Sequence, residues 1–128
     1  MKRVMIVEDE ILVRVGLRSF LNWEEHGYTI SAEASDGREA LEQIETDPPD
    51  IILTDLKMSG MNGFELIRQC RERFPEIHFI VLSSYNDFDN VREAMKLGAD
   101  DYIFKLSSSP DGLLKTLDEV SEKTDTQL

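Results

Sequence analysis

Acidic and basic side chains that could act on a phosphoryl group follow several short apolar runs of this sequence. Glu8, Asp9 and Glu10 come after one such run, Asp55 comes after another, and Lys105 comes after a third. If the runs before Glu8 and Asp55 are neighbouring strands, the three carboxylates of Glu8, Asp9 and Asp55 lie together, with the Lys105 ammonium nearby. Adjacent carboxylates repel one another and raise one another's pKa. A hard divalent cation such as Mg²⁺ relieves that repulsion, because it prefers oxygen ligands.

Hydroxyl groups complete this set, since Ser83 and Ser84 end another apolar run. A metal ion, a carboxylate, an ammonium and a hydroxyl around one position are what phosphoryl transfer needs. The carboxylate attacks phosphorus in line, and the cations offset charge on the equatorial oxygens. Asp55 is the expected nucleophile, and we expect it to be exposed. Gly60 and Gly63 in the following loop leave the backbone free to bend near the phosphoryl group.

The elements that position these residues alternate along the chain. Buried-strand patterns cover residues 2–9, 28–35, 50–54, 78–84 and 101–105. Helical patterns cover residues 11–23, 36–47, 62–74, 88–98 and 111–123. This alternation predicts an α/β fold with a parallel five-stranded sheet covered by helices on both faces. Right-handed crossovers then bring all the strand C-termini, and the candidate residues, to one edge.

Local signals define several helix ends and faces. Ser35 or Asp36 is placed to cap helix 36–47, and Ser109 with Pro110 to begin the last helix. Gly98 is a stop for helix 88–98. Three apolar residues of that helix are spaced to face the core: Phe88, Val91 and Met95.

Length and composition limit the kind of protein. The 128 residues are the length of one domain, which we assign to residues 1–122, with 123–128 as a polar tail or the start of a linker. The net charge of -12 and the lack of a basic stripe argue against nucleic-acid binding by this domain itself. No apolar run is long enough to span a membrane. The single cysteine fits a cytoplasmic location.

Four motifs in order, VEDE, LTDLKMSGMNG, VLSS and GADDYIFK, make residues 2 to about 122 similar to the receiver domain of two-component response regulators. The resemblance implies a flavodoxin-like (βα)5 three-layer sandwich of strand order 2-1-3-4-5. It implies that Asp55 accepts a phosphoryl group from a sensor histidine kinase. It also implies that Mg²⁺ is bound by Asp9, Asp55 and the backbone carbonyl of Lys57, with Glu8 reaching it through water.

The resemblance implies a switch as well. Lys105 contacts the phosphoryl oxygens, Ser83 swings toward them, and Tyr102 rotates inward behind it. The face from the fourth strand to the fifth helix then changes and favours a homodimer. The phrase LNWEEHGY is similar to receivers that precede AraC-type DNA-binding domains, so we expect the chain to be cut from a transcription regulator. Purely structural roles also fit, with Ser83 satisfying a backbone group and Tyr102 lying in the core.

Two positions depart from the family pattern. Leu106 follows Lys105 where the family carries proline, and Ser59 stands where proline is common. A cis bond before leucine costs about 3 kcal/mol, against about 1 kcal/mol before proline. We therefore expect either a trans bond with a rerouted loop at residues 107–110 or a strained cis bond that the surrounding packing holds. Our hypothesis is that a mis-aimed Lys105 slows phosphorylation or weakens signalling.

Three other functions compete with a phosphorylated switch. A phosphatase of the haloacid dehalogenase type needs a second aspartate two residues after the nucleophile, where Lys57 stands. A flavin-binding module needs a loop that holds phosphate, which the acids of residues 8–10 would repel. A stand-alone or degenerate receiver could act through protein–protein contacts without an attached DNA-binding domain. We favour the switch, which phosphorylates and dephosphorylates itself but is not an enzyme for other substrates.

Overall fold

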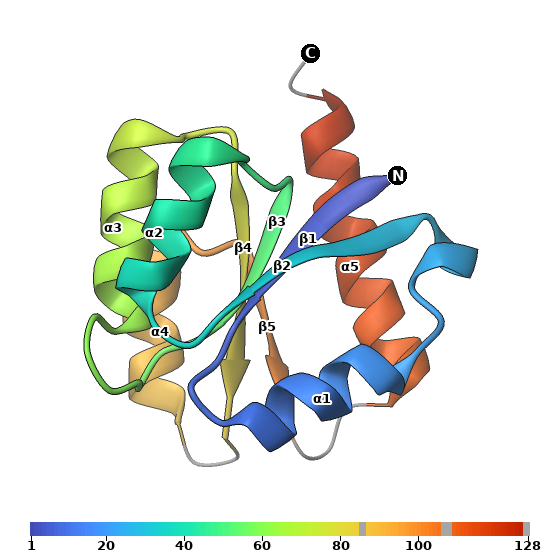
Figure 1. The fold of residues 1–128 in the computed structure, drawn as a ribbon, viewed down its shortest axis with the longest axis horizontal. Coiled ribbons are helices and arrows are strands. Elements are labelled where there is room, and N and C mark those ends of the chain that lie inside the picture. The colour runs from blue at the N-terminus through green and yellow to red at the C-terminus, as the bar shows by residue number, and fades with distance from the viewer. Residues whose placement is uncertain (85–86, 106–108, 127–128) are drawn as a thin grey trace.

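Apolar runs and amphipathic segments fold as alternating strands and helices in a computed structural model that describes residues 1–84, 87–105 and 109–126 (Figure 1). The strands are β1 (Lys2–Val7), β2 (Tyr28–Ala34), β3 (Ile51–Asp55), β4 (His78–Ser83) and β5 (Asp101–Phe104). The helices are α1 (Ile11–Phe20), α2 (Gly37–Thr46), α3 (Gly63–Arg73), α4 (Phe88–Leu97) and α5 (Pro110–Thr126), with a short 3₁₀ helix η1 (Glu24–His26).

The five strands form one parallel sheet in the order β2-β1-β3-β4-β5. At its carboxyl edge, Val7 pairs with Ala34 on one side and Thr54 on the other, and Asp55 pairs with Leu82. The ends of β1 and β3 therefore lie side by side. The predicted fold class and strand order are confirmed.

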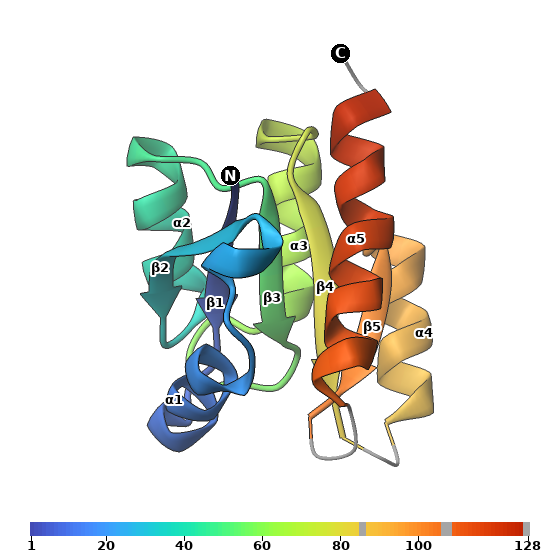
Figure 2. The same cartoon turned by 90° about the vertical axis from the view of Figure 1, so that its right-hand side faces the viewer.

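Helices cover both faces of the sheet, with α2, α3 and α4 on one face and α5 on the other, while α1 lies at the carboxyl end of the strands (Figure 2). Strand β1 is buried on both faces, because Met5 and Val7 join the core under α2–α4 while Val4 and Ile6 join the core under α5. This explains why the central strands carry continuous apolar runs instead of alternating ones. The predicted three-layer arrangement is confirmed.

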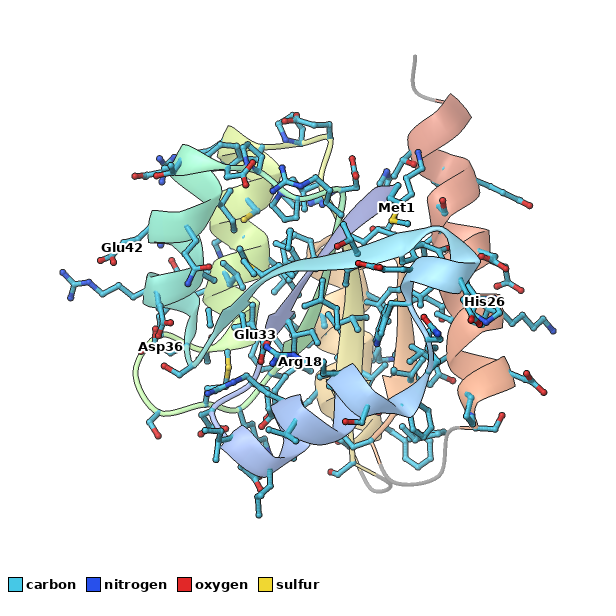
Figure 3. The ribbon with its side chains drawn as sticks, turned by 45° about the vertical axis from the view of Figure 1, so that its right-hand side comes forward. Met1, Arg18, His26, Glu33, Asp36 and Glu42 are labelled. Atoms are coloured by element: carbon cyan, nitrogen blue, oxygen red, sulfur yellow. The ribbon has the colours of Figure 1, made fainter. Side chains whose placement is uncertain are left out.

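Helix α1 packs less closely than the other helices. It ends at Phe20, earlier than predicted, and none of its ten residues is buried. It lies across the carboxyl end of the sheet, whereas α5 runs along the strands (Figure 1). Arg14 and Arg18 bind it to Glu33 of β2, and Figure 3 shows Arg18 beside Glu33. These ion pairs add to the contacts of Leu17 and Phe20, which are partly buried against the core under α5.

The predicted inner face of α4 is wrong. Phe88 is 72% exposed and Met95 is 38% exposed, while Val91 is only partly buried. Ala94 is the buried residue of the helix, within the core that α2 and α3 share. The small side chain of Ala94 lets the helix backbone approach the sheet, and this orientation turns the larger side chains outward.

The helix ends follow local side-chain chemistry. Asp36 caps α2 by accepting a hydrogen bond from Glu39 N at 2.9 Å, and Ser109 Oγ accepts one from Gly112 N at 3.0 Å. Gly98 ends α4 with φ +116°. Helix α5 continues to Thr126, further than its polar composition predicted. The domain boundary at residue 122 stays a prediction.

Candidate functional site

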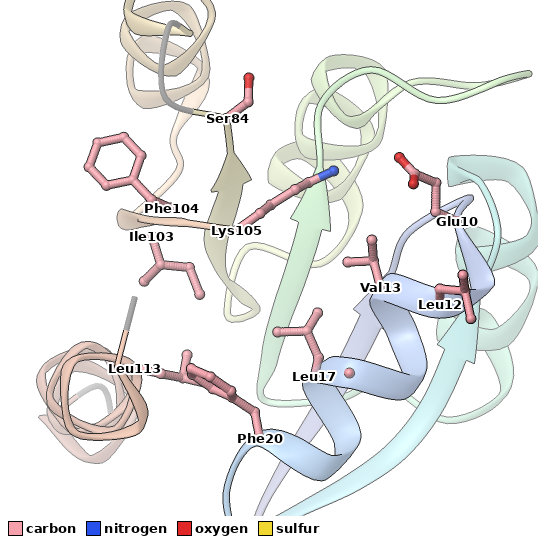
Figure 4. Close-up of a pocket in the computed structure, with 11 residues that line it drawn as sticks. Glu10, Leu12, Val13, Leu17, Phe20, Ser84, Ile103, Phe104, Lys105 and Leu113 are labelled. Atoms are coloured by element: carbon pink, nitrogen blue, oxygen red, sulfur yellow. The ribbon is translucent and has the colours of Figure 1, made fainter. Parts of the chain in front are cut away.

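Three ionisable side chains meet at the carboxyl edge of the sheet. Asp55 is the last residue of β3, Glu8 follows β1, and Lys105 follows β5. The Lys105 ammonium lies 2.9 Å from Glu8 Oε2 and 2.9 Å from Asp55 Oδ2. Figure 4 shows the Lys105 side chain reaching from the end of β5 toward the end of β3. One ammonium therefore bridges two carboxylates that come from different strands.

Asp55 is largely buried, with only 9% of its surface exposed. One of its carboxylate oxygens accepts a hydrogen bond from Leu56 N at 2.7 Å, and the other accepts one from Lys105 Nζ at 2.9 Å. The expectation of an exposed aspartate is therefore wrong in this state. The Lys105 side chain and the backbone that follows β3 both contact the carboxylate and restrict solvent.

Glu8 is fully buried, and burial is the main reason that its pKa is raised to about 7. The Lys105 ammonium lowers this pKa, whereas the charge of Asp55 raises it further. For Lys105, burial lowers the pKa, but its pairing with Glu8 and Asp55 outweighs burial and the pKa is raised. The site therefore holds a glutamate that is poorly stabilised in its ionised form and a lysine that stays charged.

Glu8, Asp9 and Glu10 each offer one carboxylate oxygen, and these oxygens lie within 4.8 Å of one another. Glu8 Oε2 is buried and accepts no hydrogen bond of good geometry, although the Lys105 ammonium is near. Donors that are all oxygen, one of them buried with only the Lys105 ammonium beside it, fit a hard cation such as Mg²⁺. The sequence analysis gave Glu10 no role in metal binding. Its position next to Glu8 and Asp9 was the feature that could have indicated one.

The loop from Leu56 to Asn62 closes the site beside Asp55. Ser59 N donates to Asp9 Oδ2 at 3.4 Å, and Gly63 N donates to Leu56 O at 3.0 Å. The side chain of Lys57 is 71% exposed, and its ammonium lies 3.9 Å from the carboxylate of Asp87 at the start of α4. The role of the Lys57 carbonyl stays a prediction.

The two candidate switch residues differ in environment. Ser83 is buried, and its hydroxyl donates to Ile103 O at 3.3 Å. Tyr102 is 41% exposed and packs edge-on against Phe104, with 5.7 Å between ring centroids. In this state Ser83 satisfies a backbone carbonyl and Tyr102 points outward. The departure at Leu106 lies outside the described residues.

A cavity of about 530 Å³ opens between α1, β5 and α5, next to Lys105 (Figure 4). Its lining is mainly apolar: Leu12, Val13, Gly16, Leu17, Phe20, Ile103, Phe104 and Leu113, with Glu10, Ser84 and Lys105 as its polar members. The cavity follows from the loose packing of α1 described above.

The sequence matches the family described as the response regulator receiver domain over residues 4–118, and the chain belongs to this family. It is 36% identical over 121 residues to the chemotaxis protein CheY of Thermotoga maritima, which is 94% of this chain and 98% of that protein. It is 34% identical over 120 residues to the uncharacterized transcriptional regulatory protein YesN of Bacillus subtilis.

Solved structures support the same assignment. The receiver domain of AraT, a response regulator from Geobacillus stearothermophilus, superposes with a TM-score of 0.88 at 35% identity, covering 98% of this chain and 97% of that one. The chain spans 32% of YesN and 54% of another Bacillus subtilis regulator, YdfI. Within the described residues, no helix is long and apolar enough to cross a membrane.

Proposed function

We propose that this receiver domain is a switch in which Asp55 accepts a phosphoryl group from a sensor histidine kinase in the presence of Mg²⁺. The observation that carries the proposal is the Lys105 ammonium, 2.9 Å from both Glu8 and Asp55, beside the cluster of Glu8, Asp9 and Glu10. A nucleophile, a fixed cation and oxygen ligands for a second cation are then together at one sheet edge.

Different residues perform different parts of the phosphoryl transfer. The Asp55 carboxylate attacks phosphorus, and the bond from phosphorus to the donor nitrogen breaks. Lys105 exchanges its contact with Asp55 for a phosphoryl oxygen and offsets its charge. Asp9, Asp55 and the Lys57 carbonyl would hold Mg²⁺, with Glu8 reaching it through water, and the bound ion would offset more of that charge. Water later removes the phosphoryl group, and the domain turns over no other substrate than the phosphodonor.

Transmission of the signal from the phosphorylated site requires two side chains to move. In the switch, Ser83 leaves the Ile103 carbonyl and turns toward the phosphoryl oxygens, and Tyr102 rotates inward. Tyr102 of β5 and Phe88 and Met95 of α4 are large hydrophobic residues that are exposed. We propose that the face from β4 to α5 changes on phosphorylation and favours a homodimer, because covering exposed apolar groups lowers the free energy.

The downstream function is regulation of transcription by an effector domain outside this sequence. Support comes from relatives that are named as transcriptional regulators and are longer than this chain. The net charge of -12 makes direct DNA contact by the receiver unfavourable. The proposal places the domain in the cytoplasm. A stand-alone receiver is the second candidate, because the match to CheY covers 98% of that protein.

The test is the intact mass after incubation with Mg²⁺ and acetyl phosphate, with the Asp55→Asn variant and a metal-free sample alongside. We expect one added phosphoryl group on the parent protein only. Equal phosphorylation of Asp55→Asn would reject Asp55 as the acceptor, and equal phosphorylation without metal would reject the Mg²⁺ requirement. If the parent gains no mass, Leu106→Pro in the same assay tests whether the missing proline is the reason.

A further inference from the structure

The loop after Asp55 is hydrogen-bonded to the start of helix α2. Helix α2 is not part of any sequence motif of the site. Gly37, the first residue of α2, is buried, and its N–H donates to the carbonyl oxygen of Met61 at 2.9 Å. The Met61 side chain also packs against the core under α2–α4. The path of the loop is therefore set by α2 as well as by β3 and α3.

The fit between these two segments leaves no room for larger residues. A Cβ atom on Gly37 would lie 2.8 Å from Met61 Cγ and 3.1 Å from Met61 O. Gly60 has φ +79°, and a Cβ atom on it would lie 2.7 Å from Asp36 Oδ2. Each segment thus supplies one glycine against which a side chain of the other packs. Asp36 is itself fixed, because it caps α2 through Glu39 N.

The same loop carries the backbone group expected to bind the metal. Lys57 lies between Asp55 and Gly60, and Ser59 N donates to Asp9 Oδ2 at 3.4 Å. A side-chain ligand can adjust its rotamer to a metal ion, but a backbone carbonyl is positioned only by the path of its loop. Contacts that fix residues 57–61 therefore bear directly on how well Lys57 can serve as a ligand.

We propose that Gly37 and Met61 are positioning residues of the magnesium site, acting through the backbone of residues 57–61. The inference rests on the proposed function, because it assumes that Lys57 contributes its carbonyl to Mg²⁺. Neither residue touches the phosphoryl group. Their contact holds the loop in one path before the metal binds, so less ordering is required at binding.

The experiment compares Mg²⁺ dissociation constants of the wild type, Gly37→Ala and the double variant Gly37→Ala with Met61→Ala, by titration calorimetry. We expect Gly37→Ala to weaken Mg²⁺ binding about tenfold, since groups that orient metal ligands typically contribute 10–100-fold in affinity. The double variant removes Met61 Cγ and Sδ and should recover part of the loss. Gly16→Ala on α1 is the matched control, because its Cβ would meet nothing within 4 Å.

Urea unfolding without Mg²⁺ separates a positioning role from a structural one. If Gly37→Ala lowers the free energy of unfolding but leaves the Mg²⁺ dissociation constant unchanged, the inference is wrong and the proposed function stands. If the wild type binds no Mg²⁺, both the metal site and this inference are wrong. Should Gly37→Ala fail to fold, Met61→Ala alone serves. It frees the loop without a clash, and we expect about threefold weaker binding; unchanged binding would overturn the inference.

Discussion

The two sides of the Asp55–Lys105 pair are built differently. On one side, the loop of residues 56–62 is held by hydrogen bonds to α2, to Asp9 and to its own ends. On the other side, α1 has no buried residue and stands over a cavity of about 530 Å³. The loop that carries the proposed metal ligand is close-packed, whereas α1 is held by ion pairs and by side chains that are only partly buried.

The space around two glycines shows this difference in packing. A Cβ atom on Gly63 would overlap the carbonyl oxygen of Asp55 and lie 2.9 Å from Leu56 Cα, so backbone would have to move. A Cβ atom on Gly16, in the middle of α1, would meet nothing within 4 Å. Glycine is therefore required at position 63, where backbone atoms leave no room for a side chain. At position 16 no such contact requires it.

The largest expected effect is that of Gly63→Ala. The added methyl group meets backbone atoms, which cannot rotate away as a side chain can, so we expect the free energy of unfolding to fall by about 3 kcal/mol. Urea unfolding at pH 7 measures it. A loss below about 1 kcal/mol would mean that the loop yields easily and that the contrast between the two sides is overstated.

Glu8 lies where the two sides meet, and its titration should change stability. Its pKa is raised from 4.5 to about 7 in the folded state, so the folded protein holds this proton more tightly than the unfolded chain. Stability from this group is present below pH 4.5 and is lost as the pH rises through about 7.

The variant Glu8→Gln should not lose stability in this way as the pH rises. Between pH 4.5 and pH 8, in metal-free buffer, we expect the unfolding free energy of the wild type to fall relative to the variant by about 1–3 kcal/mol. Parallel pH profiles of the two proteins would show that Glu8 titrates normally. Added Mg²⁺ should reduce the difference, because a nearby cation favours the ionised carboxylate.

A smaller effect of opposite sign is expected for Gly16→Ala. Alanine is favoured over glycine inside a helix, and no atom blocks the new methyl group. We expect a gain of about 0.5–1 kcal/mol in unfolding free energy. Destabilisation would instead indicate that α1 approaches another element in solution and closes the cavity, which would remove the contrast.

The smallest effect is expected for Phe88→Ala on α4. Because Phe88 is 72% exposed, we expect the unfolding free energy to change by less than about 0.5 kcal/mol. Leu66→Ala on α3 is the buried control and should cost about 2–5 kcal/mol. A loss of similar size for Phe88→Ala would indicate that Phe88 faces the core, as the sequence predicted.

The sequence predicted the sheet and its edge because both depend on local patterns. Continuous apolar runs define buried strands, and the parallel topology then aligns the ends where Glu8, Asp55 and Lys105 stand. The position of α1 could not be predicted, because its contacts join separate elements, as the ion pairs of Arg14 and Arg18 with Glu33 of β2 do. Helical spacing reports which residues share a face but not how a helix is rotated on the sheet.

The interior of the site was predicted less completely for a similar reason. The burial of Asp55 and the raised pKa of Glu8 depend on how loop and lysine close around them, and residue type carries little information on that. The contact of Gly37 with Met61 joins segments 24 residues apart in number and has no sequence motif. Packing of one backbone segment against another is the part of the site that residue types do not reveal.

Trp23 gives the molecule a built-in optical reporter. It is the single tryptophan of the chain, it is only 5% exposed, and its indole N–H donates to Leu17 O at 3.1 Å. It packs in the core beneath α5, on the α1 side of the site. Its emission wavelength therefore reports changes in the core to which it belongs, and a spectral change on adding acetyl phosphate would show when such a change occurs, without any attached dye.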